Sequence, residues 1–95
     1  MARQFQFDIL TRDKTFFSAR VTSLVCPEMI GFFGVLAHHA PLVARSRGGR
    51  LTIRQNLNEE RAFRVGPGIL EVLPARLSGG TGGRVILLTK QAEAE

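Results

Sequence analysis

Short stretches of this chain alternate between apolar and polar residues. Residues 5–9, 50–54 and 63–65 follow this pattern, with phenylalanine, isoleucine, leucine or valine at every second position. Neighbouring side chains of a β-strand point to opposite faces of a sheet, so a period of two predicts strands with one apolar face. Three further stretches are predicted strands: 19–25, 42–46 and 69–73.

The run Val85-Ile86-Leu87-Leu88 is apolar without interruption. A strand that is covered on both faces has this continuous pattern. We therefore expect residues 85–88 to form an interior strand, with packed neighbours on either side of its sheet.

Turn-forming residues separate the predicted strands at intervals of roughly 8–12 residues, which is typical of β-sandwiches and barrels. These signals are Arg12-Asp13-Lys14, Pro27-Glu28, Gly48-Gly49, residues 56–59, Gly66-Pro67-Gly68 and the glycine-rich tract 78–83. We interpret 78–83 as a hairpin tip, because the Lys and Ser/Thr that complete a phosphate-binding loop do not follow it. The expected fold is all-β, a roughly ten-stranded β-sandwich or flattened barrel of two packed sheets.

The chain has 95 residues, the size of one domain. We expect the sandwich to occupy residues 1–90, and residues 91–95 to form a frayed C-terminal tail that is too short for an isolated helix. Cys26 is the one cysteine, and its apolar neighbours predict a small buried hydrophobe. No apolar run approaches the ~20 residues that a membrane-spanning helix needs.

The formal net charge is +5, from 13 Lys and Arg against 8 Asp and Glu. The arginines are spread along the chain without a block of five basic residues, which favours a solvated charged surface. An alternative is a small basic β-barrel that binds single-stranded nucleic acid through arginines and stacked phenylalanines. Most phenylalanines fall at core positions of the predicted strands, and this argues against nucleic acid as a partner.

His38 and His39 are the best candidates for chemistry in the sequence. Adjacent side chains of an extended segment point to opposite faces, so the pair does not readily share a metal ion. Asp8 alternates with core phenylalanines and is expected to face solvent or a partner. We predict no catalytic, cofactor or metal site, and a stand-alone enzyme finds no support in the sequence.

Residues 31–42 combine glycines, two histidines and a proline between predicted strands. Glycine adopts backbone angles that other residues resist and proline lacks an amide donor, so we expect a shaped connection here. Phe32 and Phe33 are consecutive. The two rings are not readily buried in the same core, so either one enters the core while the other covers a loop, or the pair meets a partner.

Three motifs carry a family resemblance: Phe5-Gln6-Phe7-Asp8-Ile9-Leu10-Thr11 with Phe17-Ser18, Gly31-x-x-Gly34-Val35-Leu36-x-x-His39-Ala40-Pro41-Leu42, and Gly68-Ile69-Leu70-Glu71-Val72. In order and spacing they resemble the N-terminal β-sandwich domain of the epsilon subunit of F-type rotary ATP synthases. The second motif is the most specific. The chain departs from the family at Ile30 and Phe32, where acidic residues are common, and at Ala37, where proline is usual.

The resemblance implies a non-catalytic central-stalk subunit, without a cofactor, that binds the gamma subunit and the c-ring and couples ion translocation to ATP synthesis or hydrolysis. The interface that it implies comprises Thr11, Gly31, Phe32, Phe33, Gly34, His38, His39 and Pro41. It also implies one copy per complex, held through the c-ring at the cytoplasmic face of the bacterial inner membrane. Family members commonly continue into two inhibitory helices, and a chain that ends at Glu95 is expected to resemble the short forms without them.

Overall fold

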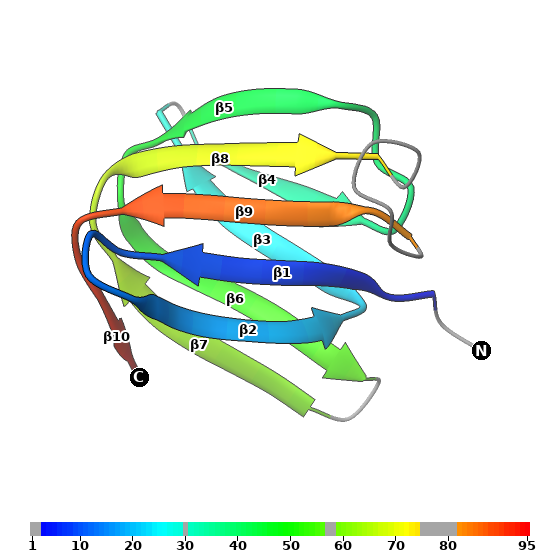
Figure 1. Cartoon of the computed structure of the whole chain (residues 1–95), viewed down its shortest axis with the longest axis horizontal. Coiled ribbons are helices and arrows are strands. Elements are labelled where there is room, and N and C mark those ends of the chain that lie inside the picture. Colours follow the sequence, from blue (N-terminus) through cyan, green and yellow to red (C-terminus); the bar gives the residue numbers. More distant parts are fainter. Residues whose placement is uncertain (1–2, 30, 57–58, 75–81) are drawn as a thin grey trace.

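The computed structural model describes residues 3–29, 31–56, 59–74 and 82–95, and these residues form ten β-strands. The strands are β1 (Phe5–Leu10), β2 (Thr15–Val21), β3 (Ser23–Glu28), β4 (Gly31–Leu36), β5 (Leu42–Ser46), β6 (Gly49–Asn56), β7 (Glu59–Val65), β8 (Gly68–Leu73), β9 (Arg84–Thr89) and β10 (Ala92–Ala94). They pack as two layers (Figure 1), with the order β2-β1-β9-β8-β5 in the first sheet and β10-β7-β6-β3-β4 in the second. The predicted all-β sandwich is confirmed, and within the described residues neither sheet closes into a barrel.

The first sheet contains the one parallel pair among the described strands. β1 and β9 pair from Gln6 with Arg84 to Leu10 with Leu88, whereas all other described pairs are antiparallel. Parallel neighbours require a long connection, which here is most of the chain. The first strand of the chain and the second-to-last therefore lie side by side within the first sheet.

The core lies between the two sheets and is formed by every second residue of most strands. Its buried apolar residues are Phe5, Phe7, Ile9, Val21, Leu24, Cys26, Val35, Leu51, Ile53, Phe63, Val65, Leu70, Val72, Val85 and Leu87. Phe17 of β2 connects the layers, since its ring centroid lies 6.1 Å from Phe7 in the first sheet and 4.8 Å from Phe63 in the second. The period-two alternation of β1, β6 and β7 thus has its predicted cause.

Two predicted elements around residue 25 have different boundaries in the structure. The single strand expected at 19–25 is wrong, because β2 ends at Val21 and β3 begins at Ser23. Thr22 lies between them, where its hydroxyl donates a hydrogen bond to the Arg54 carbonyl over 3.0 Å. The turn expected at Pro27-Glu28 is also wrong, since both residues belong to β3. The register with β6 ends at Val25, so the proline occurs where β3 has a neighbour on one side only.

Strand β4 replaces the first half of the predicted connection at 31–42. Residues 31–36 pair with β3, and only 37–41 connect β4 to β5.

The expected frayed tail at residues 91–95 is also wrong, because β10 pairs with β7 from Ala92 with Val65 to Ala94 with Phe63. Of the predicted hairpin tip at 78–83, residues 78–81 lie outside the described residues.

Candidate functional site

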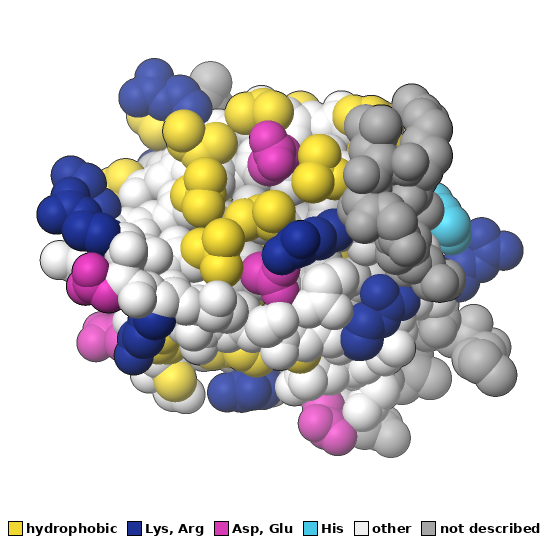
Figure 2. All heavy atoms as spheres, viewed as in Figure 1, with side chains coloured by type: hydrophobic (Ala, Val, Ile, Leu, Met, Phe, Trp, Pro, Cys, Tyr) yellow, Lys and Arg dark blue, Asp and Glu magenta, His cyan; other side chains and the backbone are white. Residues whose placement is uncertain are grey.

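The outer face of the first sheet carries a group of exposed or half-buried apolar side chains, which we call the apolar face: Leu10, Val43, Ile69, Ile86 and Leu88. The strand register makes the group contiguous, because Leu88 lies between Leu10 and Ile69. Val43, Ile69 and Leu88 retain 67%, 46% and 49% of their surface exposed. Apolar side chains gather over β5, β8 and β9 in the same view (Figure 2). Contiguous apolar surface of this kind is typical of a site that docks a partner.

The apolar face contradicts the expectation that residues 85–88 are covered on both sides. Val85 and Leu87 of β9 point into the core, whereas Leu88 is half exposed on the outer side. No element of the described chain packs over the outer side of β9 (Figure 1). The sequence reasoning missed this surface, although the uninterrupted apolar run was its signal.

Asp8 lies at the edge of the apolar face and is covered by its own neighbours, with 3% of its surface exposed. Its Oδ1 accepts hydrogen bonds from the Ser18 hydroxyl at 2.6 Å and the Gln6 amide at 2.9 Å, and its Oδ2 accepts one from Arg84 Nε at 2.8 Å. Burial by itself raises the pKa of Asp8, but these hydrogen bonds and the Arg84 charge together hold the pKa below its ordinary value of 3.8. Asp8 therefore lies on the outer side of the sheet, as the alternation predicted, but it does not face solvent, and its contact with a partner stays a prediction.

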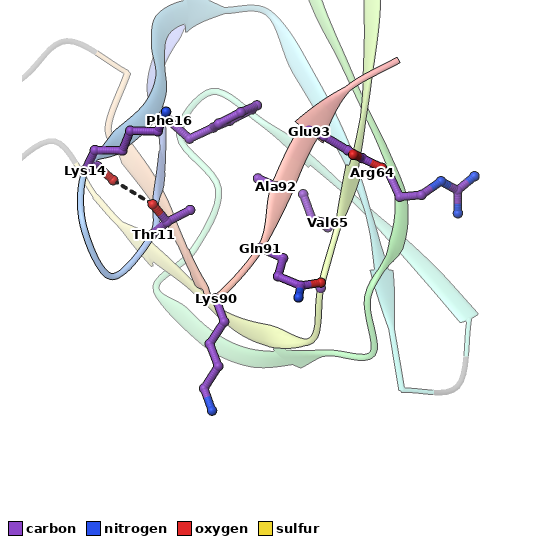
Figure 3. A pocket seen from close by; sticks show the side chains of 10 residues that line it. Thr11, Lys14, Phe16, Arg64, Val65, Lys90, Gln91, Ala92 and Glu93 are labelled. Carbon is purple, nitrogen blue, oxygen red and sulfur yellow. Dashed lines mark hydrogen bonds between the residues drawn. The ribbon is translucent and has the colours of Figure 1, made fainter.

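Thr11 follows β1 and fixes the turn to β2. Both its amide and its hydroxyl donate hydrogen bonds to the Lys14 carbonyl, at 2.9 and 3.1 Å. It lines a shallow pocket of about 560 Å³ between this turn, the end of β7 and the segment that leads into β10 (Figure 3). Lys14, Arg64 and Lys90 surround the opening. Glu93 is the acidic residue of the lining, so cations predominate in this pocket.

The two phenylalanines of β4 separate, as in the alternative that places one ring in the core. Phe33 packs against the core, whereas Phe32 keeps 59% of its surface exposed. The Arg47 guanidinium carbon lies 4.9 Å from the Phe32 ring centroid, a cation–π contact. Gly31 and Gly34 lie on the same strand, opposite Glu28 and Val25.

His38, His39 and Pro41 lie in the connection from β4 to β5. His38 has a φ of 66°, and its amide donates a hydrogen bond to the Gly82 carbonyl at 3.0 Å. A left-handed conformation is unusual for histidine and is held here by that backbone contact. His39 Nδ1 lies 2.7 Å from the Ala40 carbonyl oxygen. These groups shape the connection rather than converge on a common point.

The predicted interface residues divide between two ends of the sandwich. Thr11 follows the last residue of β1. His38 lies near the beginning of β1, because it contacts Gly82, and the adjacent Gly83 accepts a hydrogen bond from the Gln6 amide. β1 has six residues and spans roughly 17 Å, which separates the two groups. Phe32 lies at the same end of the sandwich as Thr11. Arg47, which contacts the Phe32 ring, lines a depression that contains Pro67, and Thr11 lines a second depression that also contains Pro67.

The side chains that are candidates for chemistry lie apart from one another. Among the described residues, no three His, Cys, Asp or Glu side chains form a group suited to a metal ion. Cys26 is buried, and this burial raises the pKa of its thiol to about 11, so it packs as a neutral group. In the part of the chain that the structure describes, no helix is long and apolar enough to cross a bilayer.

Phenylalanines that stack with bases need exposed rings, and this chain offers few. Phe5, Phe7 and Phe63 are in the core, Phe16, Phe17 and Phe33 pack against it, and Phe32 is the exposed one. The nucleic-acid alternative therefore finds no support in the placement of the aromatic residues.

Comparison with known proteins identifies the family. The profile described as "ATP synthase, Delta/Epsilon chain, beta-sandwich domain" matches residues 4–78. The chain is similar to the ATP synthase epsilon chain of Chlorobium limicola, with 34% identity over 88 residues that cover 93% of this chain and 91% of the relative.

Solved structures share the fold at low sequence identity. A chain of the Euglena gracilis mitochondrial ATP synthase (OSCP/F1/c-ring) has a TM-score of 0.81 at 19% identity, over 99% of this chain and 55% of that one. A chain of the Tetrahymena thermophila mitochondrial ATP synthase (central stalk/c-ring) has a TM-score of 0.71 at 10% identity, over 97% and 67%. The profile match and the curated relatives, together with the sandwich itself, show that this chain belongs to the ATP synthase epsilon chain family.

Proposed function

We propose that the chain is a central-stalk subunit of an F-type ATP synthase, which binds the gamma subunit and the c-ring and couples ion translocation to ATP synthesis or hydrolysis. Its membership of the epsilon chain family supports this role. The observation that carries the proposal is the apolar face, an exposed surface on a domain whose described residues hold no group of His, Cys, Asp or Glu side chains suited to a metal ion. The chain serves the enzyme complex as a mechanical part and does not itself react.

A two-layer sandwich suits the transmission of torque. Its interior is close-packed and its strands are hydrogen-bonded across each sheet, so the domain deforms little under load. The β1–β9 pair adds to this stiffness, because it joins strands that are far apart in the sequence within one sheet.

Two surfaces are available for two partners. We propose that the apolar face and the adjoining Thr11 contact the gamma subunit, because apolar surface needs cover. The end of the sandwich that carries Gly31 and Phe32 then faces the c-ring, with the half-buried Phe33 and the exposed Gly34 following on the same strand. His38, His39 and Pro41 lie beyond the opposite end of β4 and form a separate contact with the partner subunits.

The proposed partners also give the location of the subunit. It lies at the cytoplasmic face of the bacterial inner membrane, one copy per complex, and is peripheral because it reaches the bilayer only through the c-ring. The net charge of +5 is compatible with acidic groups on partner subunits.

Co-expression with the cognate gamma subunit tests the proposal. A 1:1 complex is expected in size-exclusion chromatography, and it should persist at about 200 mM salt because apolar contacts resist screening. A labelled single-stranded oligonucleotide serves as the control ligand and is expected not to bind. Absence of the gamma complex, with oligonucleotide binding that falls steeply as salt increases, would contradict the proposal.

A further inference from the structure

Glu71 lies in the middle of the apolar face. It is the fourth residue of β8, and the register places it between Val43 of β5 and Ile86 of β9. Its side chain is half-buried on the outer side of the sheet, with apolar neighbours on both adjacent strands. A carboxylate therefore occupies a surface that is otherwise suited to apolar contact.

Within the part of the chain that the structure describes, Glu71 has no ion pair within 4.0 Å and no hydrogen bond to its carboxylate. Two cations are its diagonal neighbours, Arg84 on β9 and Arg45 on β5. Arg84 turns to Asp8 instead, through Nε and Nη2. Arg45 is exposed at the corner of the sheet.

The charges on this face consequently do not balance around Glu71. Asp8 and Arg84 neutralise each other and can be covered as a pair. Covering Glu71 without a partner would bury an uncompensated carboxylate, which is strongly unfavourable. A protein that docks on the apolar face must therefore supply a cation at this point, or Glu71 must take up a proton.

We infer that the gamma subunit segment covering the apolar face places a Lys or Arg side chain against Glu71, flanked by apolar side chains that contact Ile86 and Val43. This inference rests on the proposed function and adds the chemistry of the partner. Glu71 then determines register and selectivity, because a segment of equal hydrophobicity without the cation would leave the carboxylate buried and unpaired.

The test measures the dissociation constant of the gamma complex by isothermal titration calorimetry. Glu71→Gln keeps the shape of the side chain and removes its charge, and it is expected to weaken binding about tenfold or more and to reduce its salt dependence. Glu71→Asp retains the charge and should lose less affinity. Glu60→Gln is the matched control, because Glu60 pairs with Arg54 on the second sheet, away from the apolar face. Thermal melting verifies that each variant is folded.

Charge reversal identifies the partner residue. Glu71→Lys should bind poorly to wild-type gamma, and one Lys→Glu or Arg→Glu variant of gamma should restore the affinity of Glu71→Lys. If Glu71→Gln binds as tightly as the wild type, or if complex formation takes up a proton and becomes tighter at low pH, the inference is wrong although the proposed function stands. If the wild-type chain does not bind gamma, the proposed function itself fails, and the inference fails with it.

Discussion

Two residues of the first sheet, Gly68 and Asp8, are constrained by a backbone neighbour and by polar side chains rather than by apolar packing. A side chain added at Gly68 would meet the Leu88 carbonyl of the adjacent strand. Asp8 is constrained differently, because three side chains donate hydrogen bonds to its buried carboxylate. Both residues lie in strands that border the apolar face, so small local changes there bear on the proposed gamma contact.

Gly68→Ala is expected to destabilise the domain, because the new methyl group collides with the Leu88 backbone, which cannot move without disturbing β9. The cost is about 1–3 kcal/mol, the usual range for overpacking. Gly34→Ala is the matched control, since its nearest contact is the Leu24 carbonyl oxygen at an ordinary 3.8 Å. Urea unfolding measures both variants, and equal stability of the two would contradict this account.

Asp8 should make stability depend on pH. The pKa of Asp8 in the folded state is lower than the ordinary value of 3.8, so the ionised carboxylate stabilises the fold above that value. The stabilisation is lost as pH falls from about 5 through the folded-state pKa, because the unfolded chain takes up the proton first. Asp8→Asn should lower the free energy of unfolding at pH 7 and flatten its decline between about pH 5 and pH 2. A decline as steep as that of the wild type would show that other groups are responsible.

At the scale of elements, β10 protects the edge of the second sheet. It pairs with β7, and the Glu95 amide donates a hydrogen bond to the Ala62 carbonyl at 3.1 Å. The Glu95 carboxylate lies 2.9 Å from Arg50 Nε and 3.6 Å from Arg64 Nη2. Unpaired strand edges promote association between molecules, so this short strand contributes to solubility as well as to stability.

Removal of residues 91–95 is expected to lower the melting temperature and to promote aggregation through the exposed edge of β7. The loss of several backbone hydrogen bonds and of Ala92 packing costs on the order of 2 kcal/mol, or about 10 °C for a domain of this size. Glu95→Gln leaves the strand in place and should melt close to the wild type, because exposed ion pairs contribute little. Calorimetry and light scattering compare the variants. A truncated chain that melts like the wild type would rule out this role for β10.

At the scale of the whole molecule, the sandwich measures 31 × 29 × 28 Å and its surfaces differ in character. The outer side of the first sheet is apolar around Glu71, whereas cations surround the turn at Gly66 and Pro67. An adaptor between two partners needs such distinct surfaces. The proposed interface residues near Phe32 and near His38 lie at separate ends, which suits contact with more than one neighbour.

The double variant Ile69→Lys/Leu88→Lys should lose binding to the gamma subunit by about 100-fold or more, because it places two charges in the proposed contact. Both side chains are half exposed, so the variant should melt near the wild-type temperature. Thr52→Lys adds a charge at the centre of the outer side of the second sheet and should bind normally. Pull-down and calorimetry measure the binding, and unchanged affinity of the double variant would exclude the apolar face as the contact.

Much of the fold was predictable because strand formation depends on local alternation. The alternation at residues 5–9, 50–54 and 63–65 correctly indicated strands, and the neighbours of Cys26 correctly indicated its burial. The separation of Phe32 from Phe33 followed from the opposite directions of adjacent side chains in a strand. The proposed interface residues follow from the family resemblance, because no local pattern identifies a contact with another subunit.

The amino-acid sequence by itself determined which segments are strands and which side of most strands is apolar, because these properties depend on residues a few positions apart. Only the tertiary structure decided that β1 lies beside β9, that Leu88 is exposed, that Arg84 covers Asp8 and leaves Glu71 unpaired, and that β10 completes a sheet. Each of these outcomes depends on which distant strands become neighbours and in which register. That choice is made by the packing of the whole core, so no local pattern records it.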